Sequence, residues 1–253
     1  MKLNRTTQRT VEILKLVSKN PEGITLDEIC SRLSLPKTSA YDIVVTLAEM
    51  GMVHVDRGQR QRYTIGLAAY RIGISYTNNS DTISVIEPEL KALAREVGKT
   101  VFFGICSGSE VVYISKAEPE NPIITTATVG TKNPMYCTSL GKAILAFSDE
   151  ESREKLLSQM RFQAYTENTI TDRAALEAQL EEVQAAGYAM DRREMEDHMQ
   201  CVGAPVFGPD GHIMGAISVS SLYKPSEDYD RLGRIAAEKA RELSKLLGFL
   251  GKR

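Results

Sequence analysis

Residues 35–53 read LPKTSAYDIVVTLAEMGMV, and the N-terminal part of the chain can be interpreted outward from this stretch. Pro36 suits the first turn of a helix because its φ is already fixed and it has no N–H to leave unpaired. Polar side chains follow at Lys37, Thr38, Ser39, Tyr41 and Asp42, and apolar ones at Ile43, Val44, Leu47 and Met50. Gly51 then ends the run. The stretch predicts a helix with a polar, exposed beginning and a buried remainder.

Two more helices are expected before this one. The first, over residues 6–20, has an apolar face formed by Val11, Leu14 and Val17 and widened by Ile13 and Leu16. The second, over residues 25–33, begins with Thr25 and carries Glu28 three positions later, which is the spacing of a capping box. Only residues 34–35 separate it from the next helix, so the joint between the two must be tight.

After Gly51 the pattern changes from the period of a helix to that of a strand. Val53 and Val55 alternate with polar residues, and so do Tyr63 and Ile65. The polar segment RGQRQ between the two runs predicts the turn of a hairpin. Three helices followed by a β-hairpin make a winged helix-turn-helix, which we place at residues 1–65.

In such a fold the polar end of the third helix reads bases, and the hairpin, or wing, contacts phosphates or a minor groove. The residues predicted to contact DNA are Thr25, Pro36, Lys37, Thr38, Ser39, Tyr41, Arg57, Arg60 and Arg62. The charge supports this only weakly, because residues 1–65 hold ten Lys/Arg against seven Asp/Glu while the rest of the chain holds 21 against 26. The alternative is an ordinary helical bundle with solvated arginines.

The remainder of the chain reads as a linker and a second domain. Residues 66–80 predict a short linker helix, and residues 81–253 mix helices with strands. Hairpins are expected around residues 107–109 and 208–211, with a further strand over residues 122–130. Because the strands are joined mainly as hairpins with helices between them, we expect an α+β domain with an antiparallel sheet.

Several classes of protein are disfavoured by the composition. The N-terminus lacks the apolar core of a signal peptide and no apolar run approaches the roughly 20 residues of a membrane span, so we expect a cytoplasmic protein without a membrane partner. The cysteines are scattered without a CxxC pair, at Cys30, Cys106, Cys137 and Cys201. The three histidines show no metal-ligand spacing either, and no cofactor is expected.

These segments together resemble the IclR family of bacterial transcription regulators over nearly the whole chain. Its reading head and linker are similar to TLDEICSRLSLPKTSAYDIVVTLAEMGMV and RYTIGLAAYRIG, and its C-terminal domain to TSLGKAILAF, GYAMDRREM and CVGAPVFGPDGHIMGAISVSS. The resemblance implies a winged helix followed by a GAF/profilin-like effector-binding domain. It departs at Asp42, where many members carry Arg, which leaves Asp42 either to accept from a cytosine or to orient Lys37 or an arginine.

The same resemblance implies a function. Family members act as homodimers or homotetramers on palindromic operators in double-stranded DNA, most often as repressors. A small effector controls them, often an organic acid or a sugar acid. For this chain we therefore expect a DNA-binding repressor with an anionic effector bound in residues 81–253.

A pocket for that effector can be built partly from the residues alone. If residues 208–211 form a four-residue loop, Phe207 faces His212 and Cys201 lies opposite Ser218. Ser220 then shares a strand face with Ser218, so the polar side chains gather on one side of the pair. The alternative is that these are small polar residues of the kind common in strands, without a binding role. A helix capped by Thr138 or Ser139 would add free N–H groups that suit a carboxylate.

The resemblance carries effector contact onto Ser139, Leu140, Asp191, Cys201, Ser218 and Ser220. Asp191 could bond an effector hydroxyl. Its alternative role is a plain ion pair with Arg192 or Lys142.

Two other classes of function remain to be weighed. GICSG, residues 104–108, has the spacing of a nucleophile elbow, but a strand follows Cys106 where that motif needs a helix. TSLGKA lacks the residues of a phosphate loop, so an enzyme is not expected. A metal or redox sensor using Cys106, Cys137, Cys201 and the histidines is the alternative to a metabolite sensor.

Overall fold

The computed structural model describes residues 3–56, 58, 60–78, 81–122 and 127–251. The chain forms two compact units that divide after residue 80, and each is described by itself. Within the described residues, no helix is both long enough and apolar enough to cross a membrane.

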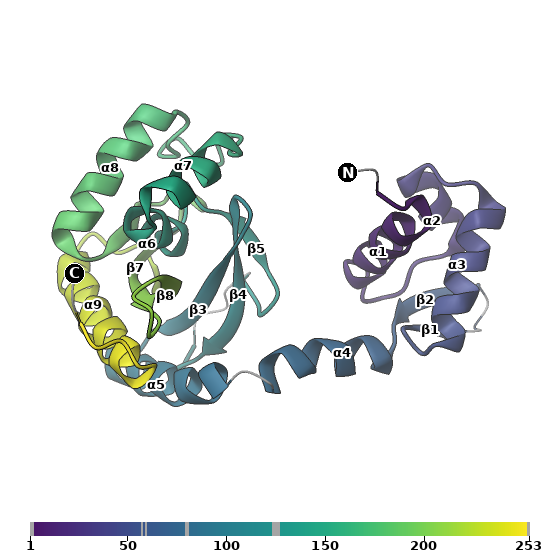
Figure 1. Ribbon diagram of the computed structural model, residues 1–253, viewed down its shortest axis with the longest axis horizontal. Coiled ribbons are helices and arrows are strands. Elements are labelled where there is room, and N and C mark those ends of the chain that lie inside the picture. Colours follow the sequence, from purple (N-terminus) through teal and green to yellow (C-terminus); the bar gives the residue numbers. More distant parts are fainter. Residues whose placement is uncertain (1–2, 57, 59, 79–80, 123–126, 252–253) are drawn as a thin grey trace. The chain divides into compact units, whose positions relative to one another are not determined.

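The first unit is a small bundle of helices with a β-hairpin, followed by one more helix (Figure 1). Its elements are α1 (Arg5–Ser18), α2 (Leu26–Leu33), α3 (Lys37–Glu49), β1 (Val53–Asp56), β2 (Arg62–Ile65) and α4 (Leu67–Asn78). β1 and β2 pair antiparallel, with Val53 opposite Ile65. Ile13, Ile29, Val44 and other apolar residues form its buried core. This arrangement confirms the predicted winged helix-turn-helix.

The ends of α2 and α3 follow the local sequence closely. The Thr25 side chain accepts the Glu28 N–H at 3.3 Å, and the Glu28 carboxylate accepts the Thr25 N–H at 2.8 Å, which completes the capping box. The tight joint turns at Ser34, whose φ of 51° lies in the left-handed region. Pro36 is the residue before α3 and not part of its first turn, a small difference from the prediction.

Two apolar residues that were expected in the core lie on the surface. Val11 is 45% exposed and Met50 is 67% exposed. Of the predicted apolar stripe, α1 buries Ile13 and Val17, which are one turn apart, and half-buries Leu14 and Leu16, so the packed face excludes Val11. Met50 caps the C-terminus of α3, beyond the last packed turn of that helix.

The second unit is built on a six-stranded antiparallel sheet in the order β5-β4-β3-β8-β7-β6 (Figure 1). The strands are β3 (Thr100–Ser107), β4 (Glu110–Ala117), β5 (Lys132–Pro134), β6 (Ala189–Asp191), β7 (Met199–Phe207) and β8 (Ile213–Leu222). The helices are α5 (Asp81–Val97), α6 (Ser139–Phe147), α7 (Glu150–Ser158), α8 (Arg173–Ala186) and α9 (Tyr229–Leu246). The predicted α+β domain with an antiparallel sheet is confirmed.

The central strands present different chemistry to the two faces of this sheet. On one face Val202, Ile217 and Val219 pack with apolar residues of α5 and α9 in a single core. On the other face lie Ser218 and Ser220, whose side chains alternate with those apolar residues. The second core forms around α6 and α8 on this side, so the serines lie beside a packed helix.

Two strand predictions need correction. Of the predicted strand 122–130, residues 123–126 lie outside the described residues, residues 127–130 are not a strand, and β5 follows at Lys132–Pro134. The β7–β8 register also differs. Phe207 lies opposite Ile213 and not His212, and Cys201 lies opposite Ser220 and not Ser218. The connection has five residues, 208–212, in place of four, which shifts the pairing by one residue, and an irregularity in the ladder between Val206 and Phe207 shifts it by one more.

The start of α6 approaches the sheet at Gly203 on β7. A Cβ atom at Gly203 would lie 2.8 Å from the carbonyl carbon and oxygen of Ser139, closer than real Cβ contacts allow. The close approach accompanies a 2.9 Å hydrogen bond between the hydroxyls of Ser139 and Ser218. Gly203 therefore permits the contact between helix and sheet on which the neighbouring cavity depends.

A Gly203→Ala substitution should force α6 away from β7 and lower the free energy of unfolding by about 1–3 kcal/mol, the usual cost of overpacking. Urea unfolding followed by circular dichroism measures this. Gly73→Ala is the control, since nothing lies within 4 Å of its added Cβ and α4 continues through it. That change should be neutral or stabilising. Equal stability of Gly203→Ala and wild type would contradict the proposed close contact.

Candidate functional site

The exposed beginning of α3 is the first candidate site. Lys37, Thr38 and Tyr41 are exposed there, and Ser39 is half-buried with its hydroxyl accepting a hydrogen bond from Arg9 Nη1 at 3.2 Å. Lys37 Nζ lies 2.7 Å from the Asp27 carboxylate on the surface. Such an exposed ion pair is weak, so a phosphate can replace Asp27 at little cost. Asp42 is exposed on the next turn.

The side chains of the other residues predicted to contact DNA differ in how far they are engaged in contacts within the protein. The Thr25 hydroxyl is engaged in the capping box. Arg62 Nη1 donates to the Gly23 carbonyl at 2.7 Å, so that arginine also ties the hairpin to the loop before α2. Arg60 is exposed in the hairpin turn, and Arg57 lies outside the described residues. Arg60 is therefore the most accessible wing cation among the described ones.

The second candidate site is a cavity of about 70 Å³ in the C-terminal unit. All six residues predicted to contact an effector line it, namely Ser139, Leu140, Asp191, Cys201, Ser218 and Ser220. The other lining residues are Phe102, Tyr113, Ala127, Asn133, Thr138, Met195, Glu196, His198 and Met199. Since about 10–15 Å³ on this measure is enough for one water, the cavity has room for a small ligand.

Strand pairing explains why the polar residues converge. Asp191 lies opposite Cys201, and Cys201 lies opposite Ser220, so the three form a row across β6, β7 and β8. The Cys201 thiol and the Ser220 hydroxyl are 3.4 Å apart, and the Ser139 and Ser218 hydroxyls are 2.9 Å apart. Hydroxyls that already bond each other can turn to donate to a ligand oxygen.

The beginning of α6 forms another part of the wall. Thr138 is the N-cap, with its hydroxyl accepting the Gly141 N–H at 3.2 Å and donating to the Pro134 carbonyl at 2.9 Å. The first turn of a helix leaves N–H groups unpaired and carries the positive end of the helix dipole. Ser139 and Leu140 lie in that turn and line the cavity, so this part of the wall favours negative charge.

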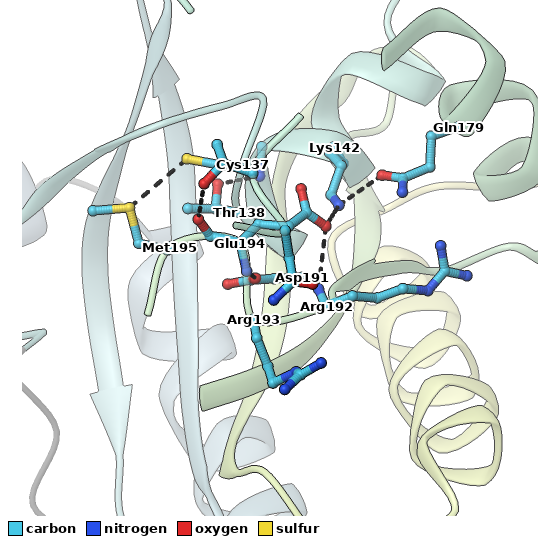
Figure 2. Close-up of polar contacts among 12 residues, drawn as sticks. Cys137, Thr138, Lys142, Gln179, Asp191, Arg192, Arg193, Glu194 and Met195 are labelled. Atoms are coloured by element: carbon cyan, nitrogen blue, oxygen red, sulfur yellow. Dashed lines mark hydrogen bonds and ion pairs between the residues drawn. The ribbon is translucent and has the colours of Figure 1, made fainter. Parts of the chain in front are cut away.

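Asp191 ends β6 and begins a tight turn, shown in Figure 2. Its Oδ1 accepts the Glu194 N–H at 2.7 Å across the turn. The turn includes Arg193 at a φ of 64°, with its guanidinium stacked over the Tyr223 ring. Burial raises the pKa of Asp191 to about 7, although Lys142 and the Glu194 N–H both act to lower it.

An ion pair with Arg192 or Lys142 was the alternative role for Asp191, but Lys142 pairs with Glu194. Its Nζ lies 2.5 Å from Glu194 Oε1 and 2.7 Å from Gln179 Oε1 on α8 (Figure 2). Lys142 and Glu194 are both fully buried, and Glu194 Oε1 also accepts the Arg192 N–H at 3.1 Å. This buried pair joins α6, the turn after β6 and α8.

Sequence reasoning missed several lining residues, although some signals existed. Phe102 enters the cavity because it lies opposite Ser218 in the β3–β8 ladder, which no local pattern predicts. Asn133 donates to the Tyr113 hydroxyl at 3.1 Å, again across strands. Glu196 and His198 directly follow the GYAMDRREM segment, so extending that segment would have found them.

The thiols do not resemble those of a redox sensor. Burial raises the pKa of Cys137 and of Cys201 to about 12, and it raises the pKa of Cys106 as well. Reactive thiols have lowered pKa values, because the thiolate is the reacting form. The described residues also contain no group of three or more His, Cys, Asp or Glu that could hold a metal ion. The metal or redox alternative therefore gains no support from the described residues.

Comparison with known families matches both units. The model of the IclR helix-turn-helix domain matches residues 6–57, and that of the bacterial transcriptional regulator IclR C-terminal domain matches residues 74–245. Among characterised relatives, the regulator BhcR of Paracoccus denitrificans is 33% identical over 95% of this chain and 86% of its own length. The repressor AllR of Klebsiella pneumoniae is 29% identical over 95% of this chain and 89% of its own.

Solved structures agree with these matches. The Thermotoga maritima IclR structure is 30% identical with a TM-score of 0.76, covering 96% of this chain and 99% of that one. An IclR regulator from Alicyclobacillus acidocaldarius is 26% identical with a TM-score of 0.84, covering 98% and 100%. These families and relatives are transcriptional regulators and not enzymes.

Replacing Lys142 by Met should destabilise the C-terminal unit by about 3–5 kcal/mol, because Glu194 would be left as a buried, unpaired charge. Chemical unfolding measures the loss. The double variant Lys142→Met with Glu194→Gln removes both charges and should recover a large part of the stability. A Lys142→Met protein as stable as wild type would mean that the pair is not sealed from water.

Proposed function

The chain belongs to the IclR family of bacterial transcriptional regulators, so it is a DNA-binding regulator and not an enzyme, and we propose that it is a repressor whose operator affinity is controlled by a small acid bound in the cavity of its second unit. Residues 1–65 would bind DNA, residues 66–80 would connect the units, and residues 81–253 would bind the effector. The repressor assignment is supported by relatives such as AllR, which is named a repressor.

The DNA-binding half rests on the surface of α3. Its first turns present exposed Lys37, Thr38 and Tyr41, the donors and aromatic surface that a reading helix needs in a major groove. The exposed Arg60 on the wing would add a phosphate contact. A homodimer or homotetramer in the cytoplasm would place two such heads on the half-sites of a palindromic operator.

The observation that carries the effector half is the cavity itself. Residues from four separate segments, the start of α6, β6, β7 and β8, meet around one small space. One part of its wall, the first turn of α6, suits a carboxylate, and the rest combines hydroxyls and a buried carboxyl with apolar side chains such as Phe102 and Met199. A short organic or sugar acid fits this combination of size and chemistry.

Control requires that the effector bind two arrangements of the protein with different affinity. The start of α6 and the turn after β6 are joined by the buried Lys142–Glu194 pair. A ligand that contacts both of these segments would therefore strain or relax a packed unit. A coupling of about 1–3 kcal/mol is typical and changes operator affinity by about five- to 150-fold. Induction of a repressor needs no more than this.

Lys37→Ala should weaken operator binding about five- to tenfold and reduce the salt dependence by about one phosphate contact, since Lys37 is expected to replace its Asp27 partner by a phosphate. The operator is first selected from a random DNA library with the full chain, and affinity is then followed by fluorescence anisotropy at several salt concentrations. Lys91→Ala, an exposed lysine of the second unit, is the control and should bind like wild type. Unchanged affinity of Lys37→Ala would remove that residue from the interface.

Ser218→Ala combined with Ser220→Ala should abolish the response to small acids while operator affinity is kept, because the hydroxyl face of the cavity is removed. A thermal-shift screen of the full chain measures the response, since a ligand at 100 times its dissociation constant stabilises by about 2.7 kcal/mol. Ser226→Ala, an exposed serine outside the cavity, is the matched control. A fully responsive double variant would place the effector elsewhere.

A further inference from the structure

The cavity wall carries acidic groups although an acid is its expected ligand. Two carboxylates, Asp191 and Glu196, line it, and among the described lining residues there is no Lys or Arg. The imidazole of His198 is the one group there that can become positive, and its Nε2 already lies 3.3 Å from the Glu196 carboxylate. An anion that enters beside an ionised Asp191 would be repelled, and strongly so because the site is poorly solvated.

The cation that acts on Asp191 is committed to a different carboxylate. Lys142 Nζ contacts Glu194 and Gln179, as Figure 2 shows. The other titratable groups that act on Asp191, or that feel its charge, are Glu194 in its own turn, Tyr113 on β4, Cys137 before α6 and Cys201 on β7. Lys142 is the only cation among them, and its charge is already balanced.

Asp191 is also placed to change its protonation state easily. The carboxyl is buried, which favours the neutral form, while the Glu194 N–H at 2.7 Å and Lys142 favour the charged form. These effects oppose each other, and the pKa of Asp191 rises to about 7. At neutral pH both forms are therefore populated in the free protein, and a negative ligand beside the carboxyl favours the protonated form further.

We propose that Asp191 is the specificity-determining residue of this cavity and that it binds the effector in its protonated form, so that a monocarboxylate enters together with one proton from solution. The effector carboxylate lies at the first turn of α6 and the serine hydroxyls. The Asp191 carboxyl keeps accepting the Glu194 N–H through Oδ1 and donates its proton to a second, uncharged oxygen of the effector. This inference rests on the proposed effector function and gives it a ligand class.

The dimensions of the cavity restrict that class. Asp191, Cys201 and Ser220 are register partners on adjacent strands, so the Cα atoms of Asp191 and Ser220 lie roughly 10 Å apart. Once the side chains are included, this span suits a short acid with its second oxygen close to the carboxylate. A dicarboxylate would bring a second charge against Asp191 and Glu196, and a neutral amide would lose the attraction of the helix terminus.

The test is isothermal titration calorimetry on the full chain with lactate, glycolate and pyruvate as probes, from about pH 6 to about pH 9, in buffers of different ionisation enthalpy. Well above the pKa of Asp191, the dissociation constant should rise about tenfold per pH unit, with close to one proton taken up per ligand. Malate and lactamide, which add a carboxylate to lactate or remove its charge, should bind at least tenfold more weakly.

Asp191→Asn mimics the protonated carboxyl, because its amide oxygen can accept the Glu194 N–H while its NH₂ group donates. Its dissociation constant should be nearly independent of pH. Asp172→Asn is the matched control, since Asp172 is the N-cap of α8 outside the cavity and Asn caps equally well. This control should keep the wild-type pH dependence.

A second readout needs no variant. Difference infrared spectroscopy of the wild-type protein should show the band of a protonated carboxylic acid appearing when the probe binds at a pH above 7. The proposal is overturned by a pH-independent dissociation constant, by a pH dependence that persists in Asp191→Asn, or by malate binding as tightly as lactate. It is also overturned if none of the monocarboxylates binds to a protein that still binds its operator.

Operator binding measured on the same samples separates this inference from the proposed function. If a probe binds without proton uptake and still changes operator affinity, the proton-linked role of Asp191 fails and the regulator assignment stands. If a probe binds with proton uptake but leaves operator affinity unchanged, the cavity chemistry stands and its regulatory role fails.

Discussion

The ion pair between Lys142 and Glu194 is the constraint on which the architecture of the C-terminal unit depends. Burying two charges costs several kcal/mol per ion, and their attraction recovers this only when the geometry is good. Here Lys142 gains Gln179 as a second acceptor, and Glu194 gains the Arg192 N–H. The pair adds little net stability, but any rearrangement that separates it leaves a buried charge. Its effect is therefore to fix where the start of α6 lies relative to the turn after β6.

That same pair gives two acidic residues of one turn different roles. Glu194 is held beside a lysine, whereas Asp191, three residues earlier, lines the cavity without a dedicated cation. Asp191 is thus left as a buried carboxyl whose pKa is raised to about 7 by its burial. The division of roles leaves a carboxyl that can respond to a ligand.

Much of this could be predicted from sequence because it depends on local periodicity. The capping box at Thr25 follows from the spacing of Thr25 and Glu28. Ser218 and Ser220 share a face because they are two residues apart in one strand, whatever the register of its pairing. The error in the β7–β8 pairing moved the partner of Cys201 by two residues, from Ser218 to Ser220, and so left it on the same face. The role of Lys142 could not be predicted, because a lysine in an apolar helix usually extends to solvent and its partner lies 52 residues away. On α1 only Val11 was misplaced, because the apolar residues of this helix cover more than one face.

The small number of cations on the candidate DNA surface suggests that two DNA-binding units, or reading heads, must bind DNA together. Of the cations predicted to contact DNA, Lys37 already pairs with Asp27 and Arg62 is tied to the Gly23 carbonyl, while Asp42 adds a negative charge nearby. Among the described residues Arg60 is exposed and Lys37 is held only by a weak surface pair, so one head offers few phosphate contacts and releases few counterions. Joining two heads makes the second contact intramolecular, and the gain depends on whether their spacing matches the half-sites. In the proposed regulator, affinity would then be sensitive to small changes in how the heads are held, and the proposed coupling from the cavity would be enough to switch it.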